Sequence, residues 1–374
     1  MPYENGGNGN RPRKKRLKKL FLRTFLITFA SLATLVFAGW LTLQSVIKPP
    51  EIPDHSPPAA KTEQHEAAYV VPEAEQEDTL IGGGLHAPEG FTRSDRKNDF
   101  YTFLIFGLDE GNNTDSIMVA AYDDANKKAY VIGLPRDLKV NVKRRVKKIN
   151  AAYPAGTLNG GGRIGGAEQL KREIKTIIGF TPDYFICVNL EAFERVIDAV
   201  GGVEVNVPYE MNYTDTAQDL TIQFDEGIRT LNGKEALAFA RHRRNNEKRG
   251  GEWVTTKSYT DYERIENQQA VIRALISKLL TPASILKLDE FIDIFNENVY
   301  TDIALNNMGW FAYKLNDIRS ADEALETYTI PTTGTTGAPD WYELPDETAI
   351  VELINSTINP YVKNIEAKDL EIAN

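Results

Sequence analysis

The strongest constraint in this sequence lies near its start, where residues 25–43 (FLITFASLATLVFAGWLTL) contain no charged side chain. A segment of this length and apolar character spans the hydrocarbon core of a bilayer, and it is longer than the apolar region of a typical signal peptide. The preceding stretch, RPRKKRLKKLFLR, is strongly basic, which favours the cytoplasmic side of a membrane. We therefore predict a cytoplasmic tail at 1–24 and one retained transmembrane helix at 25–47.

The residues that follow this apolar segment have a different composition. Residues 48–97 are rich in proline, glutamate and alanine, and their apolar residues follow no helical or strand period. Such a composition is typical of an extended, poorly ordered linker. It predicts an extracytoplasmic linker, followed by a folded extracytoplasmic domain over residues 98–374. The protein is then a single-pass protein of the cell membrane.

Composition excludes several classes of protein. The formal net charge of −10 argues against a nucleic-acid partner, because nucleic-acid-binding domains are usually strongly basic. The single cysteine, Cys187, excludes an internal disulfide and a cysteine zinc cluster. Its position inside an apolar segment predicts a buried core residue.

The pattern of apolar runs predicts the α/β class. Three runs of strand length occupy residues 101–107, 116–122 and 129–135, and the turn DDANKK joins the last two as a hairpin. Helical and strand patterns alternate from about residue 167 onward. We therefore expect a central mixed β-sheet flanked by helices. The glycines of NGGGRIGG are interpreted as a flexible turn, because no G-K-[ST] follows them as in a phosphate-binding loop.

Cations gather in the stretch LNGKEALAFARHRRNNEKRG, residues 231–250. Asn232 and Glu235 have the spacing of a capping box and predict the start of a helix. On a continued helix, Arg241 and Arg243 point in divergent directions, whereas both point one way if the helix ends first and the chain extends. The sequence leaves both alternatives open.

A second group of charges lies on the buried side of a predicted helix. Advancing 100° per residue places one stripe on Asp261, Arg264, Gln268, Ile272, Leu275, Ile276 and Leu279. An arginine that faces a core needs a partner, because an unpaired buried charge is very costly. That partner is either Asp261, in a structural ion pair, or an anionic ligand.

Taken together, these charges suggest a site for a pyrophosphate. Arginine forks and a divalent cation both suit phosphate oxygens. The candidate cations are Arg136, Lys148, Arg241, Arg243 and Arg264. Asp109 and Asp115, in the loop LDEGNNTD, are candidate Mg²⁺ ligands, with simple solvation as the alternative. No Ser-His-Asp or Cys-His arrangement is evident in the sequence.

Several motifs follow one another along the chain in a fixed order. They are GLD…TDSIM, LPRD, KINAAY, DYFICVNLEAFERVIDAVGGVEVNVP, LNGKEALAFARHRR, DYERIENQQ and LETYTIP. In this order they resemble the LytR–CpsA–Psr family of cell-wall glycopolymer ligases, densely from about residue 100 to 285 and more loosely to about 360. The single membrane anchor and the external domain also match the family, which belongs to envelopes of the Gram-positive type.

The resemblance implies a phosphotransferase. Its donor is a glycopolymer, such as a teichoic acid or capsule, linked to polyprenyl pyrophosphate, and its acceptor is the 6-hydroxyl of N-acetylmuramic acid in peptidoglycan. Asp109 and Asp115 are then expected to hold Mg²⁺ or Mn²⁺, and Asp261 to orient the arginines. The expected pyrophosphate contacts are Arg136, Lys148, Arg241, Arg243, Arg264 and Gln268.

Other features of the resemblance leave questions open. Many relatives have an arginine shortly after the aspartate of the GLD loop, where this chain has Glu110, Gly111 and Asn112. Asp137 and Asp261 are candidates for the general base. A pyrophosphate hydrolase and a non-catalytic regulator or binding module are the alternative functions.

Overall fold

The structure is a computed structural model, and it describes residues 49–55, 87–108, 113–217, 220–281, 287–315, 320–337 and 340–372. The predicted cytoplasmic tail and transmembrane helix lie outside these residues. Of the helices described, none combines the length and apolar character needed to cross a membrane. The described residues form two compact units: residues 49–50 with 304–312, and residues 51–303 with 313–372. The first unit contributes most of helix α9, Leu305–Leu315.

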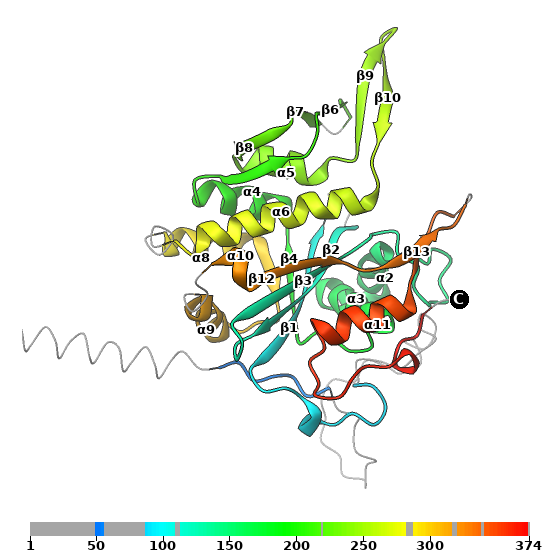
Figure 1. Cartoon of the computed structure of the whole chain (residues 1–374), viewed down its shortest axis with the longest axis vertical. Helices are drawn as coiled ribbons and strands as arrows, with labels where there is room; N and C mark the ends of the chain where they lie inside the picture. Colours follow the sequence, from blue (N-terminus) through cyan, green and yellow to red (C-terminus); the bar gives the residue numbers. More distant parts are fainter. Residues whose placement is uncertain are drawn as a thin grey trace, which may run out of the picture. The chain divides into compact units, whose positions relative to one another are not determined.

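The second unit is organised around a six-stranded mixed sheet with the order β11-β4-β1-β2-β3-β12 (Figure 1). Strand β1 pairs in parallel with β4, and β3 with β12, while the other neighbours are antiparallel. The predicted mixed sheet and the β2–β3 hairpin are therefore confirmed. The strands are β1 Phe100–Leu108, β2 Thr114–Asp123, β3 Lys128–Leu134, β4 Tyr184–Val188, β11 Val299–Thr301 and β12 Leu325–Thr329.

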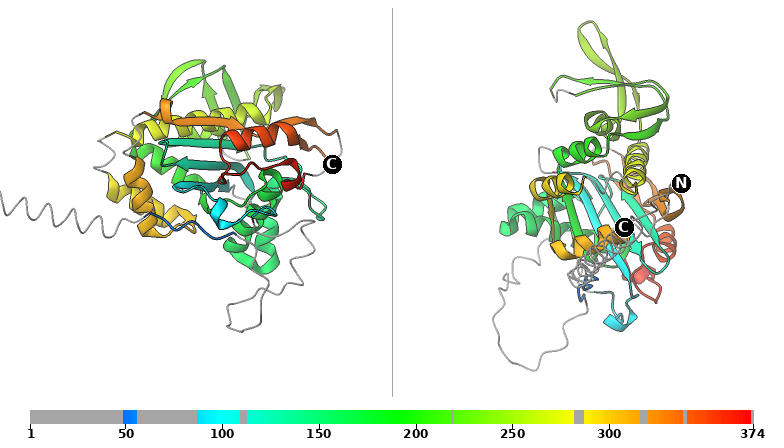
Figure 2. Two further views of the ribbon diagram at one scale, coloured as in Figure 1. Left: turned by 60° about the horizontal axis from the view of Figure 1, so that its bottom comes forward. Right: turned by 90° about the vertical axis from the view of Figure 1, so that its left-hand side faces the viewer.

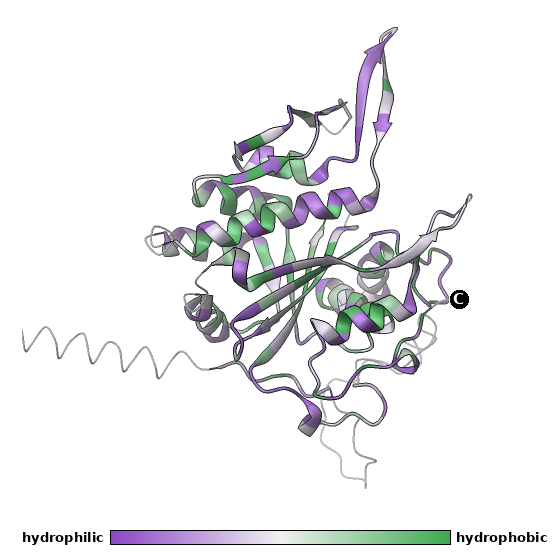
Figure 3. Ribbon diagram, in the orientation of Figure 1, coloured by the Kyte–Doolittle hydropathy of each residue, from purple (hydrophilic) through white to green (hydrophobic). Residues whose placement is uncertain are grey.

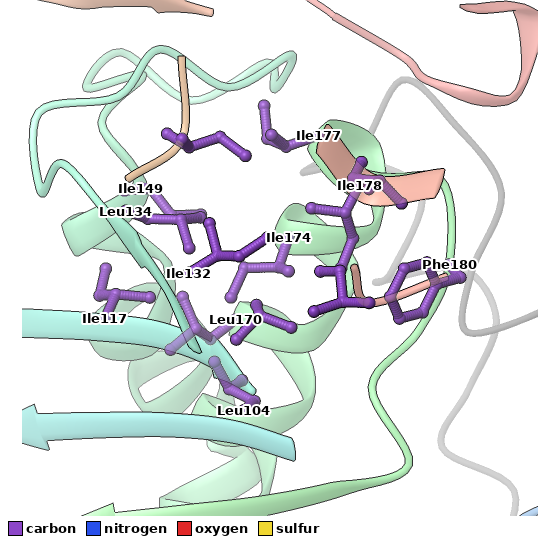
Figure 4. Packing of buried hydrophobic residues seen from close by; sticks show 14 of the residues in the cluster. Leu104, Ile117, Ile132, Leu134, Ile149, Leu170, Ile174, Ile177, Ile178 and Phe180 are labelled. Atoms are coloured by element: carbon purple, nitrogen blue, oxygen red, sulfur yellow. The ribbon is translucent and has the colours of Figure 1, made fainter. Parts of the chain in front are cut away.

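Helices cover both faces of this sheet because successive strand residues point to opposite sides. On one face, Leu104 and Ile132 pack against Ile174 of helix α3, Gly162–Ile178, as Figure 4 shows. Helix α11, Glu347–Ser356, belongs to the same cluster. On the other face, Met118 and Val131 pack against helix α6, Asp261–Leu279. The views in Figure 2 show the helices on either side of the strands.

A second layer packs on the far side of α6. It contains two helices and two strand pairs, and residues such as Val203, Phe239 and Val271 form its buried core. The elements are α4 Leu190–Ala199, α5 Gly233–Arg241, β5 Val203–Val207 with β8 Gly227–Leu231, and β6 Met211–Asp215 with β7 Leu220–Phe224.

Helix α6 lies between the central sheet and this second layer, and the single apolar stripe predicted for it is therefore incomplete. Asp261 and Arg264 are buried as predicted. Val271, which lies off the predicted stripe, is 0% exposed and packs in the second layer. A helix between two packed layers needs two apolar faces, so one stripe could not describe it.

The glycine-rich segment, residues 159–166, forms a turn only in its first part, and helix α3 begins within it. After α2, Ala152–Gly156, the chain makes one irregular turn over Thr157–Gly161 and then enters α3. A Cβ atom on Gly156 would lie 2.3 Å from the carbonyl oxygen of Gly165, which is inside α3. The glycines therefore permit two helices to approach closely.

The folded part begins earlier than the predicted boundary at residue 98. Phe91 contacts Tyr361 edge to face, with 4.9 Å between ring centroids. Arg96 forms an ion pair with the buried carboxylate of Asp183. Residues 87–97, which the composition assigned to the linker, thus pack against the domain.

The remaining elements are shorter or lie at the periphery. They are β9 Arg244–Arg249, β10 Glu252–Ser258, α8 Leu288–Asn298, α10 Ala321–Ala324, β13 Thr332–Thr335 and β14 Glu343–Pro345. Strands β9 and β10 form a hairpin that is mainly hydrophilic (Figure 3).

Two isoleucines of α3 test the packing of this core. Ile174 is 0% exposed, whereas Ile164 near the start of the same helix is 62% exposed. We expect Ile174→Ala to lower the free energy of unfolding by about 2–5 kcal/mol, because it leaves a cavity. Ile164→Ala is the matched control, with an expected change within about 0.5 kcal/mol. Urea unfolding of the two variants measures the difference, and equal losses would contradict this packing.

Candidate active site

The site forms where the end of β3 meets the start of α6. The chain leaves β3 at Leu134, and the next residues are Pro135, Arg136 and Asp137. The Arg136 backbone N–H donates to Asp261 Oδ2 at 3.1 Å, and its Nη1 donates to Asp115 Oδ1 at 2.6 Å. Strand β2, the turn after β3 and helix α6 therefore meet at one arginine.

Asp261 is the first residue of α6, and local signals fix its position. Thr260 and Glu263 form a capping box that starts the helix. Asp261 Oδ1 lies 2.8 Å from Arg264 Nη2 and 4.0 Å from Arg243 Nη2. The Asp261 and Arg264 side chains are only 8% and 5% exposed. The structural ion pair, one of the two alternatives from the sequence, is thus present.

The ion pair does not satisfy the arginines of the cluster. The Nε atoms of Arg136, Arg243 and Arg264 are buried and have no hydrogen-bond partner among the described residues. Buried donors without acceptors are costly, which points to an acceptor that binds there. The Asp261 Oδ1 atom also makes no aligned hydrogen bond, despite its short distance to Arg264.

Mutual repulsion among the cations is visible in their pKa values. Burial lowers the pKa of Arg264; Asp261 opposes this shift, and the charges of Arg243 and Arg136 add to it. Burial also lowers the pKa of Arg243, and the charge of Arg136 lowers it further. Burial likewise disfavours the charge of Arg136, but the hydrogen bond to Asp115 and the negative charges of Asp115, Asp137 and Asp261 together outweigh it, so that the pKa of Arg136 is raised. An anion between these groups relieves the repulsion.

Lys148 reaches the cluster through Asp137. The Lys148 ammonium lies 3.1 Å from Asp137 Oδ1. The Lys148 backbone carbonyl accepts a hydrogen bond of 2.7 Å from Arg144 Nη2, and Arg144 also forms an ion pair with Glu173 of α3. The Glu173 side chain is 0% exposed. We did not predict from the sequence that Arg144 and Glu173 position Lys148. The only indication in the sequence was that Glu173 lies among the apolar residues of α3.

Gln268 and the end of α5 complete the site. Gln268 accepts a 3.1 Å hydrogen bond from Ser116 of β2, and its Nε2 donates to the Ala240 carbonyl at 3.4 Å. Helix α5 ends at Arg241, and the next residue, His242, is extended. The capping box predicted at Asn232 and Glu235 is confirmed. Of the two backbone alternatives, the chain adopts the one in which the helix ends and the chain extends.

The structure brings most of the predicted residues together. They are Asp115, Arg136, Asp137, Lys148, Arg243, Asp261, Arg264 and Gln268. Arg241 lies at the end of α5, and Asp109 lies outside the described residues. Within the described ranges, no group of three or more His, Cys, Asp or Glu side chains is placed to hold a metal ion.

The fold and the site define an α/β protein that gathers arginines around one buried aspartate. The comparisons with known proteins identify its family. The chain belongs to the LytR_cpsA_psr family, whose model matches residues 63–359.

Several named proteins are similar to this chain. The chain is 29% identical over 276 residues to the polyisoprenyl-teichoic acid–peptidoglycan teichoic acid transferase TagU of Oceanobacillus iheyensis, covering 72% of this chain and 78% of that protein. It is 26% identical to the transferase TagV of Bacillus subtilis, covering 72% and 66%. The regulatory protein MsrR of Staphylococcus aureus is 28% identical, with 66% and 68% covered.

Solved structures show the same fold. Bacillus subtilis TagV superposes with a TM-score of 0.54 at 24% identity, covering 74% of this chain and all of that one. The structure of TagT bound to LIIa-WTA gives 0.54 at 19% identity, covering 76% and 98%. A LytR-Csp2A-Psr enzyme from Actinomyces oris gives 0.55 at 20% identity, covering 75% and 95%.

The buried pair at the start of α6 makes a prediction about stability. We expect Asp261→Asn to lower the free energy of unfolding by about 3 kcal/mol, because Arg264 then keeps a buried charge without its partner. Asp225→Asn is the control, since Asp225 pairs with Arg229 in an exposed i,i+4 ion pair. Its expected cost is within about 1 kcal/mol. Urea unfolding measures both variants, and similar losses would show that Asp261 is dispensable for folding.

Proposed function

We propose that this protein transfers a glycopolymer from polyprenyl pyrophosphate to peptidoglycan. The bond formed is a phosphodiester to the 6-hydroxyl of N-acetylmuramic acid, and polyprenyl phosphate leaves. The observation that carries this proposal is the set of arginines with unpaired buried Nε donors around Asp261. Membership of the family and the names of the transferase relatives support the choice of substrates.

The arginines account for much of the proposed catalysis. Arg136, Arg243 and Arg264 present forked donors that suit the oxygens of a pyrophosphate. Each charge-assisted hydrogen bond contributes roughly 1.5–3 kcal/mol, and contacts that strengthen as the leaving phosphate gains charge lower the barrier. Lys148, Arg241 and Gln268 are proposed as further contacts. Asp261 holds the arginines in place through its contacts with the Arg136 backbone and Arg264.

The lipid part of the donor is proposed to lie along the apolar part of α6. This helix begins with Asp261 and Arg264 and continues with Ile272, Leu275 and Ile276, which are apolar and only partly buried. Figure 3 shows the same change from hydrophilic to more hydrophobic residues along α6. A polar head group and an apolar chain thus suit successive turns of one helix.

We also propose Mg²⁺, with Mn²⁺ as a substitute, at the pyrophosphate. The carboxylate of Asp115 is 43% exposed and supplies the oxygen ligands that Mg²⁺ prefers. Asp109 is the proposed second ligand. One or two carboxylates are enough, because Mg²⁺ usually completes its shell with phosphate oxygens and water. When bound, the ion neutralises charge on the pyrophosphate.

The proposed substrates require a location at the outer face of the cell membrane. The apolar segment at residues 25–47 is proposed to anchor the chain there, with residues 1–24 in the cytoplasm and the domain outside. A lipid-linked donor and peptidoglycan are both available on that side in an envelope of the Gram-positive type.

A product assay tests the proposed function. The full chain in detergent is mixed with a short polyprenyl-pyrophosphate glycan, peptidoglycan oligomers and Mg²⁺, and the products are identified by mass spectrometry. We expect a phosphodiester-linked conjugate that falls by at least about 100-fold in Arg136→Ala, because charge stabilisation of the leaving group is lost. We also expect a chelator to abolish it.

The control variant is Arg249→Ala, in the exposed β9–β10 hairpin, which is expected to keep full activity. Hydrolysed donor without conjugate would instead identify a pyrophosphate hydrolase. A donor that binds and stays intact would identify a binding module or regulator. Activity that survives the chelator would exclude the metal while leaving the transferase in place.

A further inference from the structure

Besides Asp115, Asp137 and Asp261, one more carboxylate lies beside the site, and it was not identified from the sequence. Glu343 is the first residue of β14, and its backbone N–H donates to the Asp137 carbonyl at 3.0 Å. Its own carbonyl accepts a 2.8 Å hydrogen bond from the backbone N–H of Lys139. These bonds attach β14 to the segment that carries Arg136 and Asp137. They hold Glu343 at the edge of the arginine cluster, although Glu343 is about 200 residues from Asp137 in the sequence.

Within the part of the chain that the structure describes, the carboxylate of Glu343 is hydrogen-bonded to a hydroxyl group and forms no ion pair with a cation. Its Oε2 accepts a 3.2 Å hydrogen bond from Thr332 Oγ1 of β13. Thr332 Oγ1 in turn lies 2.6 Å from the phenol oxygen of Tyr262 in α6. Among the described residues, the ion pairs of the cluster involve Asp115, Asp137 and Asp261, and none involves Glu343.

This distinguishes Glu343 from the two base candidates of the sequence. Asp137 is paired with Lys148, and Asp261 holds Arg264 and the Arg136 backbone. A carboxylate that neutralises a cation has little capacity to accept a proton. Glu343 is half-buried and forms no ion pair with a described cation, so its carboxylate can accept a proton.

The electrostatic surroundings also favour proton uptake by Glu343. Burial raises the pKa of Glu343, the Thr332 hydroxyl opposes this, and the negative charges of Asp261 and Asp137 add to it. The ionisable groups around it are Asp137 with its partner Lys148 on one side and Asp261 and Tyr262 of α6 on the other. A carboxylate whose pKa is raised toward neutral pH is a stronger general base.

We propose that Glu343 is the general base that accepts the proton of the attacking hydroxyl group. This inference rests on the transferase function proposed above. The acceptor oxygen forms a bond to the phosphorus that carries the glycopolymer. The bond from that phosphorus to the bridging oxygen breaks, and polyprenyl phosphate leaves with the electron pair. The hydroxyl proton passes to the Glu343 carboxylate, which afterwards releases it to solvent.

The first test replaces the carboxylate with its amide. We expect Glu343→Gln to lower kcat for conjugate formation by roughly 100-fold or more, the usual contribution of a general base. Its Kd for the donor, measured by titration with the short polyprenyl-pyrophosphate glycan, is expected to stay within about twofold, because the pyrophosphate contacts remain. Glu343→Asp is expected to recover part of the rate. Glu352→Gln, at an exposed position of α11, is the control with wild-type kcat.

A second variant reports on the base through pH and keeps the Glu343 carboxylate. Thr332→Val removes the hydrogen bond that holds down the pKa of Glu343, so this pKa rises further. A base works only when deprotonated, and kcat therefore falls as the pH falls through its pKa. The acid limb of the kcat profile is expected to move up by roughly 0.5–1 pH unit. Thr335→Val, at an exposed position of β13, is the control with an unmoved profile.

The outcomes separate this inference from the proposed function. A wild-type kcat in Glu343→Gln, or an acid limb that stays in place in Thr332→Val, overturns the role of Glu343 while the transferase stands. Equal thermal unfolding of Glu343→Gln and the wild type excludes misfolding as the cause of a lost rate. If the wild-type chain forms no conjugate, the proposed function fails, and the inference fails with it.

Discussion

The contact between Asp261 and the turn after β3 is the interaction on which the site depends. One carboxylate accepts the backbone N–H of Arg136 and lies 2.8 Å from the guanidinium of Arg264. It thereby fixes the first turn of α6 against the end of a central strand. Because the pair is almost fully buried, its attraction is screened little by water. The same burial makes any loss of the aspartate expensive.

The cluster around this contact holds more cationic donors than the described residues satisfy. Four described cations, Arg136, Lys148, Arg243 and Arg264, face three carboxylates, Asp115, Asp137 and Asp261. Three guanidinium Nε atoms remain without an acceptor in the described part of the chain. Such a site is poorly satisfied when empty and well satisfied by an anion with several oxygens. This difference is the physical basis for proposing a pyrophosphate ligand.

Local patterns predicted much of this arrangement. The three strands before Arg136, the capping box at Asn232 and the buried Asp261–Arg264 face depend on neighbours within a few residues. They were therefore accessible to arguments from periodicity and spacing. Cys187 is a buried strand residue, as predicted.

Features that depend on distant segments were beyond such arguments. A second face of α6 is buried because another layer packs against it, and a search for one apolar stripe along the helix does not predict that layer. The glycines of NGGGRIGG, residues 159–166, were interpreted as a flexible turn, because the sequence does not show that α2 packs closely against α3. The support of Lys148 by Arg144 and Glu173, and the position of Glu343 beside Asp137, join residues far apart in the chain.

The sequence by itself determined the class of fold, the strand and helix starts near the site, and the types of charge that meet there. These follow from hydrophobic period, capping and motif order, which are local properties of the chain. Among the described residues, the tertiary structure alone decided which carboxylates of the site are neutralised by a cation and which has a hydroxyl partner instead. That outcome depends on distances between β2, β14 and α6, and the energy of a charge depends on its neighbours in space.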